Sequence, residues 1–179
     1  MIVFTSPGAR PQTGGATREY QVKALFLLNL AKFVDWPASS FPGPQASFVI
    51  CVVGQDPFGA SLDDATTGHM VGDRGIEVDR YPSTRNLSEA QFCQIVFVSS
   101  SEKQRLRKII TFYQSKNALL VGDTQGFAST GGAIEFQMDG DQVRFTINPD
   151  AAEHAGLKLS SKLLSLATIV HGDSTQGNN

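Results

Sequence analysis

Two uninterrupted apolar runs constrain the fold of this chain most strongly: FVICVVG at residues 48–54 and CQIVFVS at residues 93–99. Each has the length of one strand and shows no alternation of polar residues. Such runs are typical of parallel strands that are covered on both faces. A shorter apolar stretch of the same kind spans residues 118–121. The three runs therefore predict the centre of a parallel sheet.

Segments with a helical spacing of apolar residues separate these runs. The first is expected to be capped by Thr17 and to continue to about Trp36, and two more are expected at about 57–65 and 101–113. A weaker strand is predicted at 76–80. Helices that alternate with parallel strands form right-handed crossovers, so the order of segments predicts a layered α/β domain.

The pattern changes in the last third of the chain. Residues 133–139 and 142–148 alternate strictly between apolar and polar side chains, and Gly140-Asp141 lies between them. This is typical of a hairpin with one solvent-exposed face. The predicted fold is therefore a three-layer α/β domain with a mostly parallel sheet, an antiparallel hairpin added at 133–148, and helices on both faces.

A chain of 179 residues suits one domain. After the hairpin, a short helix is expected at 150–155 and a last helix at about 160–171. The single domain is expected to span 17–171. It would be preceded by a flexible leader at 1–16 and followed by a flexible tail at 172–179, because both ends are rich in glycine and polar residues.

Charge and hydropathy exclude some classes of partner. The chain has 15 basic and 17 acidic residues, so its net charge of −2 gives no electrostatic reason to expect nucleic acid or an anionic membrane. No run of 18 apolar residues is present, so no insertion into a membrane is expected. The first residues lack the apolar core of a signal peptide. That leaves a cytosolic protein and a secreted domain without its signal as alternatives.

The segment GFASTGGAIEF at 126–136 has three glycines in seven residues and could be taken for a phosphate-binding loop. A P-loop needs a Lys-Ser or Lys-Thr after its last glycine, and a dinucleotide fingerprint must open a helix. Here Gly131-Gly132 precedes a strand instead. We therefore interpret the glycines as part of a turn with positive φ that leads into the hairpin, and phosphate binding as the weaker alternative.

Candidate catalytic side chains are few. Ser99 follows a strand but lacks the GxSxG elbow of a hydrolase, so a helix cap is favoured. Asp123 lies where open α/β sheets place ligands, although a capping role explains it equally well. Ser160 begins a helix and could contact an anion, with a cap again favoured. We therefore expect no enzyme, no cofactor and no metal site.

Cys51 and Cys93 lie in the two apolar runs. Taken alone, the residues favour two small buried side chains over a disulfide. No CxxC motif and no spacing of cysteine and histidine suggests a metal site.

Several segments together resemble the YfiR/HmsC-like family, and the resemblance extends from about Tyr20 to Val170. The two most specific segments are GDTQGFASTGGAIEF and AGLKLSSKLLSLA. The segments are AKFVDWP (31–37), FVICVVGQDPFG (48–59), CQIVFVSSSE (93–102), VRFTIN (143–148), GDTQGFASTGGAIEF (122–136) and AGLKLSSKLLSLA (155–167).

The resemblance implies a small periplasmic regulator with a compact α/β fold and no known chemistry. It implies that the protein binds and represses a membrane-bound diguanylate cyclase, and thereby lowers cyclic-di-GMP output and restrains biofilm formation. The implied partners are the periplasmic region of that inner-membrane cyclase, an outer-membrane lipoprotein that relieves the repression, and a second copy of the chain in a homodimer.

The implied periplasmic location also changes the expectation for the cysteines, because the periplasm permits disulfides. The runs at 48–54 and 93–99 should be neighbouring strands, which brings their residues close to disulfide distance. A Cys51–Cys93 disulfide and two free thiols then become equal alternatives. Some family members have a later second pair of cysteines, which this chain lacks.

Two surfaces are candidates for function. The end of the first helix, with Phe33, Val34 and Trp36, is the expected protein interface because exposed aromatic side chains are good anchors. Core packing is an equal alternative for Trp36. The alternative function is a small-ligand sensor with a pocket at the carboxyl ends of the strands. The expected lining residues are Ser99, Asp123, Gly126, Phe127, Asn148 and Ser160.

Overall fold

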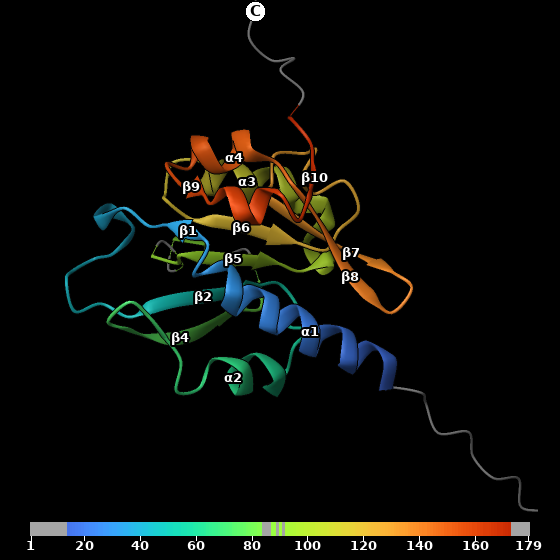
Figure 1. Cartoon of the computed structure of the whole chain (residues 1–179), viewed down its shortest axis with the longest axis horizontal. Coiled ribbons are helices and arrows are strands. Elements are labelled where there is room, and N and C mark those ends of the chain that lie inside the picture. The colour runs from blue at the N-terminus through green and yellow to red at the C-terminus, as the bar shows by residue number, and fades with distance from the viewer. Residues whose placement is uncertain (1–13, 84–86, 89, 91, 173–179) are drawn as a thin grey trace, which may run out of the picture.

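The computed structural model describes residues 14–83, 87–88, 90 and 92–172, and its centre is an eight-stranded sheet (Figure 1). The strand order is β10-β8-β7-β6-β5-β2-β4-β3. The strands, in chain order, are β2 (Phe48–Val53), β3 (Met70–Val71), β4 (Arg74–Tyr81), β5 (Ile95–Val98), β6 (Leu119–Gly122), β7 (Ile134–Asp139), β8 (Gln142–Ile147) and β10 (Thr168–Ile169).

The middle of the sheet is parallel, from β4 through β2, β5 and β6 to β7. β7 and β8 form the antiparallel hairpin, and β3 is antiparallel to β4. The three apolar runs form β2, β5 and β6, and all residues of β5 and β6 are buried. The predicted fold class is therefore confirmed: a mostly parallel sheet with an antiparallel pair.

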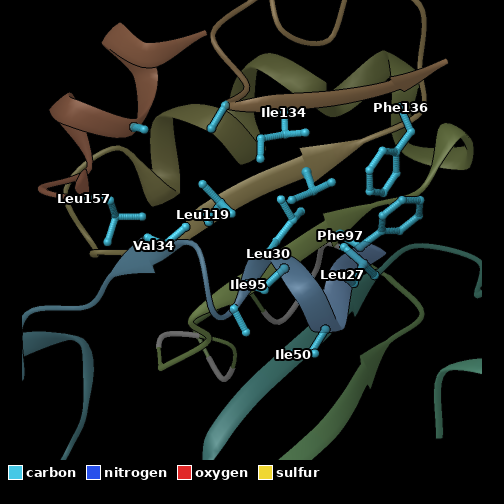
Figure 2. Packing of buried hydrophobic residues seen from close by; sticks show 14 of the residues in the cluster. Leu27, Leu30, Val34, Ile50, Ile95, Phe97, Leu119, Ile134, Phe136 and Leu157 are labelled. Carbon is cyan, nitrogen blue, oxygen red and sulfur yellow. The ribbon is translucent and has the colours of Figure 1, made fainter. Parts of the chain in front are cut away.

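Helices cover both faces of the sheet. α1 (Gly14–Leu30) and α2 (Ala60–Thr66) pack on one face, where Leu27 and Leu30 lie against Ile50, Ile95 and Leu119 (Figure 2). The 3₁₀ helix η3 (Ser100–Arg105) and α3 (Leu106–Tyr113) lie on the opposite face, where a second apolar cluster forms; this face is called the α3 side. Because the side chains of a strand alternate between faces, each central strand supplies both clusters.

A second, two-stranded sheet closes one end of the domain. β1 (Val34–Asp35) pairs antiparallel with β9 (Lys158–Leu159). The short helices η1 (Ala38–Ser40), α4 (Pro149–His154) and α5 (Ser161–Leu164) flank this region. Among the described residues, none of the helices has the length and apolar content needed to cross a bilayer.

The prediction that the first helix continues to Trp36 is wrong. α1 ends at Leu30, and the chain turns so that Val34 pairs with Leu159. Trp36 precedes a proline, which disfavours a helical conformation at that residue. The helix also begins at Gly14, before the predicted cap. The rest of the predicted leader, 1–13, lies outside the described residues.

The prediction of a last helix over 160–171 is also wrong. α5 covers only Ser161–Leu164, and the chain then forms β10 beside β8. Thr168, Ile169 and Val170 form a β-branched run, which favours extended structure. Val170 N donates a hydrogen bond of 2.9 Å to Ile147 O, so the pairing with β8 continues past β10. The predicted tail, apart from residue 172, lies outside the described residues.

Candidate functional site

Two of the six residues predicted to line a pocket, Gly126 and Asn148, do border one groove. It lies on the α3 side of the sheet and has a volume of about 1010 Å³. α3, α4 and the turn at 124–131 form its walls. Its lining contains both polar and apolar residues, among them the charged residues Arg107, Asp150 and Glu153 and the imidazole of His154.

Asn148 is buried and joins two walls of the groove. Its Nδ2 donates a hydrogen bond of 2.9 Å to Ala128 O, and its Oδ1 accepts one of 3.2 Å from Ala151 N. The second bond caps α4. Asn148 therefore fixes the hairpin end, the turn and α4 relative to one another.

The glycine-rich turn already holds an anionic group, which comes from the chain itself. Gly126 N and Ala128 N each donate a hydrogen bond of 3.1 Å to the carboxylate of Glu135. Gln137 Nε2 donates a third bond, of 3.0 Å, to the same carboxylate. Because Glu135 is buried and occupies the amides that a phosphate would need, the interpretation of this segment as a structural turn is confirmed.

Phe127 explains why glycine is needed on both sides of this turn. Its ring is fully buried between Gly122 and Gly132. A Cβ on Gly132 would lie 2.0 Å from the ring, and one on Gly122 would lie 2.6 Å from it. Phe127 is thus a packing residue beneath the groove rather than part of its polar lining.

Asp123 faces the opposite side of the sheet and anchors α1. Its Oδ2 accepts hydrogen bonds from Tyr20 Oη at 2.7 Å and from Lys23 Nζ at 2.9 Å. Lys23 is only 2% exposed and also pairs with Glu19. Burial, followed by the hydrogen bond to Asp123, raises the pKa of Tyr20 well above its usual range. The arrangement ties the helix to the carboxyl end of β6.

The partners of Asp123 were not predicted, although the sequence contains a signal for one of them. Lys23 lies on the apolar stripe of α1 that also carries Leu27 and Leu30. A lysine on a buried helix face needs an opposite charge, because an unpaired buried ammonium is strongly unfavourable. The second oxygen of Asp123, Oδ1, is buried and has no hydrogen-bond partner among the described residues.

Ser99 and Ser160 lie apart from the groove and cap helices. Ser99 Oγ accepts a hydrogen bond of 3.4 Å from Ser101 N at the start of η3. Ser160 Oγ accepts one of 3.2 Å from Leu163 N at the start of α5. Both hydroxyls satisfy main-chain amides that a helix start leaves without partners.

Cys51 and Cys93 form a disulfide that joins β2 to the segment before β5. Their Cα atoms are 5.8 Å apart, and 42 positions separate them in sequence. Both residues are buried within the apolar cluster on the α3 side. In the described part of the chain, no group of histidine, cysteine and acidic residues could hold a metal ion.

The residues of the expected protein interface lie in and beside β1. Val34 is buried in the core, whereas Phe33 and Trp36 are half-buried. The Trp36 ring packs edge-on against Phe48 with centroids 5.1 Å apart, and its Nε1 donates to Ala31 O at 3.0 Å. Trp36 therefore packs against the core and also keeps part of its surface exposed.

Comparison with known proteins identifies a family and a similar fold. A family model described as YfiR/HmsC-like matches residues 20–168. No curated protein matches the chain. Among solved structures, the ABC domain in complex with L-Trp from Streptococcus pneumonia is similar, with a TM-score of 0.58 and 11% identity. The match covers 82% of this chain but only 60% of that one, and it shows the fold alone.

Proposed function

Since the chain belongs to the YfiR/HmsC-like family of periplasmic regulators, we propose that it is a non-enzymatic protein that binds and represses a membrane-bound diguanylate cyclase. It would contact the periplasmic region of the cyclase, lower cyclic-di-GMP output and so restrain biofilm formation. The observation that carries the proposal is the family match over residues 20–168, which includes nearly the whole domain.

The roles of the polar side chains near the strand ends support a binding protein rather than an enzyme. Ser99 and Ser160 cap helices, Asp123 holds α1, and Glu135 holds the glycine-rich turn. Each of these side chains has a structural partner within the chain. Catalysis would instead need a nucleophile or base with a reactive atom directed at a substrate.

We expect the cyclase to contact the exposed parts of Phe33 and Trp36. They lie in the segment between α1 and η1, next to the exposed side chains of Lys32 and Asp35. Aromatic side chains with charged neighbours are typical of the centre and rim of protein interfaces. Buried Val34 would contribute indirectly, because its pairing with Leu159 fixes the position of the segment.

Isothermal titration calorimetry with the purified periplasmic region of a cyclase encoded nearby tests this function. We expect binding that Phe33→Ala weakens about tenfold, as removal of an interface anchor does. Phe92→Ala removes a ring that is 49% exposed elsewhere and should leave the affinity unchanged. Failure of the wild-type chain to bind any such region at high micromolar concentration would contradict the proposal.

Two further partners follow from the same family. One is a second copy of the chain, which sedimentation velocity over a range of concentrations would detect as a dimer. The other is an outer-membrane lipoprotein that removes the regulator from the cyclase. If the lipoprotein acts in this way, adding it to the preformed complex should release the cyclase region.

The alternative function is a small-ligand sensor, and the groove beside Gly126 and Asn148 favours it. A volume of about 1010 Å³ is large enough for a metabolite. The similar solved structure contains L-Trp, so that amino acid belongs in a screen with nucleotides and vitamins. A ligand that binds the folded state raises the melting temperature. No shift with any compound would leave this alternative without support.

A further inference from the structure

We propose that the outer edge of β4 is a docking site for an extended, positively charged segment of another protein. β4 lies at one side of the sheet, beyond β2 (Figure 1). β3 covers its outer side only at Arg74 and Gly75. Within the described ranges no other strand pairs with residues 76–80 on that side, and these residues are called the β4 edge.

The direction of the main-chain groups shows what the β4 edge offers. Tyr81 O accepts a hydrogen bond of 2.9 Å from Gly54 N, so the main chain of Tyr81 faces β2. Along a strand, consecutive residues direct these groups to opposite sides. The N–H and C=O groups of Ile76, Val78 and Arg80 therefore point outward, over about 13 Å at the usual strand rise. An added strand would satisfy all of them.

The β4 edge belongs to an acidic part of the sequence. Residues 56–80 include six acidic and two basic residues, a formal charge of −4, whereas the whole chain has a net charge of −2. Glu77 and Asp79 are both exposed and belong to the edge itself. Ile76 and Val78, which alternate with them, pack towards the core on the other face. A strand that pairs here therefore meets two carboxylates on one face.

The two arginines of this region do not neutralise those carboxylates. Arg80 pairs with Asp56 at 2.7 Å and with Asp63 at 2.6 Å, on the side of α2. Arg74 lies over the ring of Phe41, with its Cζ 3.9 Å from the centroid. Both cations thus have partners elsewhere, and basic side chains on an incoming segment would complement Glu77 and Asp79.

A second copy of the chain fits the β4 edge less well. In antiparallel pairing about a twofold axis, directly opposed residues lie on the same face, so their numbers differ by an even amount. The registers centred on 77, 78 and 79 then oppose Glu77 to Glu77, Glu77 to Asp79, or Asp79 to Asp79. Like charges in directly opposed positions destabilise a strand pair. The same charges that disfavour self-pairing favour a basic partner.

Hydrogen exchange measured by NMR on the full chain tests the edge, independently of any cyclase. In the free protein, the amides of Val78 and Arg80 should exchange fast and those of Glu77 and Asp79 slowly. A fluorescein-labelled octapeptide of alternating lysine and valine should bind with micromolar affinity and protect Val78 and Arg80. Binding should weaken with salt, because exposed charges are screened. The same peptide with glutamate in place of lysine should not bind.

Charge reversal provides the matched test of the partner's chemistry. Glu77→Lys/Asp79→Lys should lower the affinity for the lysine peptide at least tenfold and should allow the glutamate peptide to bind. Asp139→Lys/Asp141→Lys makes the same change of charge at the exposed tip of the β7–β8 hairpin and should alter neither affinity. The proposal would be overturned if the two double variants bound the lysine peptide with equal affinity, or if that peptide did not bind the wild type. Protection of Val78 that rises with protein concentration alone would assign the edge to a second copy.

Discussion

The buried ion pair between Lys23 and Asp123 should dominate the attachment of α1 to the sheet. Lys23 is 2% exposed, and the Asp123 side chain is 6% exposed, so solvent screens the pair very little. Removing one partner of such a pair costs about 3–5 kcal/mol, because the other charge stays buried without compensation. We expect Lys23→Met to lower the free energy of unfolding by that amount.

Urea unfolding followed by circular dichroism measures this loss. With an m-value of about 2 kcal/mol/M, the midpoint should fall by about 1.5–2.5 M. Lys103→Met, at an exposed position of η3, is the control and should shift the midpoint little. The double variant Lys23→Met/Asp123→Leu should recover most of the loss, since an apolar pair can replace a buried ion pair.

The recovery distinguishes the ion pair from simple packing of the lysine stem. Tyr20 loses its acceptor in the double variant, which costs about 1 kcal/mol and sets the expected shortfall. If Lys23→Met and the Lys103→Met control lose the same amount of unfolding free energy, the ion pair does not hold α1 on the sheet. If the double variant loses the sum of the single losses, the two residues are not energetically coupled.

Three further predictions concern the packed turn and the disulfide. Gly132→Ala places a Cβ 2.0 Å from the Phe127 ring and should lower the free energy of unfolding by about 3 kcal/mol in urea titration; a loss below about 1 kcal/mol would mean that the ring moves freely. Glu135→Gln weakens the charge-assisted bonds to two amides and should cost about 1.5–3 kcal/mol, with an unchanged melting temperature as the contrary result. Replacing Cys51 and Cys93 together by alanine opens a loop with a sequence separation of 42 and should lower the free energy of unfolding by about 4 kcal/mol. Reduction of the wild type with dithiothreitol should give a similar loss. No change in either experiment would refute this prediction.

The sequence predicts those parts of the fold whose environment repeats along the chain. β2, β5 and β6 are buried on both faces, so their apolar runs are continuous. The sequence of the β7–β8 hairpin alternates between apolar and polar residues, and its outer half is exposed. The two-residue strands β1, β9 and β10 leave no such pattern. They exist because of partners far away in sequence, such as Leu159 for Val34 and Ile147 for Ile169.

The candidate site shows the same division. Asp123 can be identified from its position after a strand, but its hydrogen-bond partners Tyr20 and Lys23 lie about a hundred positions earlier. Glu135 belongs to a predicted strand and gives no local sign that its carboxylate turns back to Gly126. Local patterns thus identify a polar residue at a strand end, whereas its role depends on which distant residue occupies the space beside it.

The chain covers each edge of the sheet only in part, and the two edges differ in the charge of their uncovered residues. At one edge, the C-terminal segment pairs as β10 with two of the six residues of β8 and extends the contact through Val170, and the uncovered part includes Arg144. At the other, β3 pairs with two of the eight residues of β4. Proteins commonly protect an open edge with charged side chains, and Glu77 and Asp79 would act in this way against a second copy. A regulator must nevertheless bind something. The outward main-chain groups of Ile76, Val78 and Arg80 could accept a basic strand, whereas two amides of the glycine-rich turn are already bonded to Glu135.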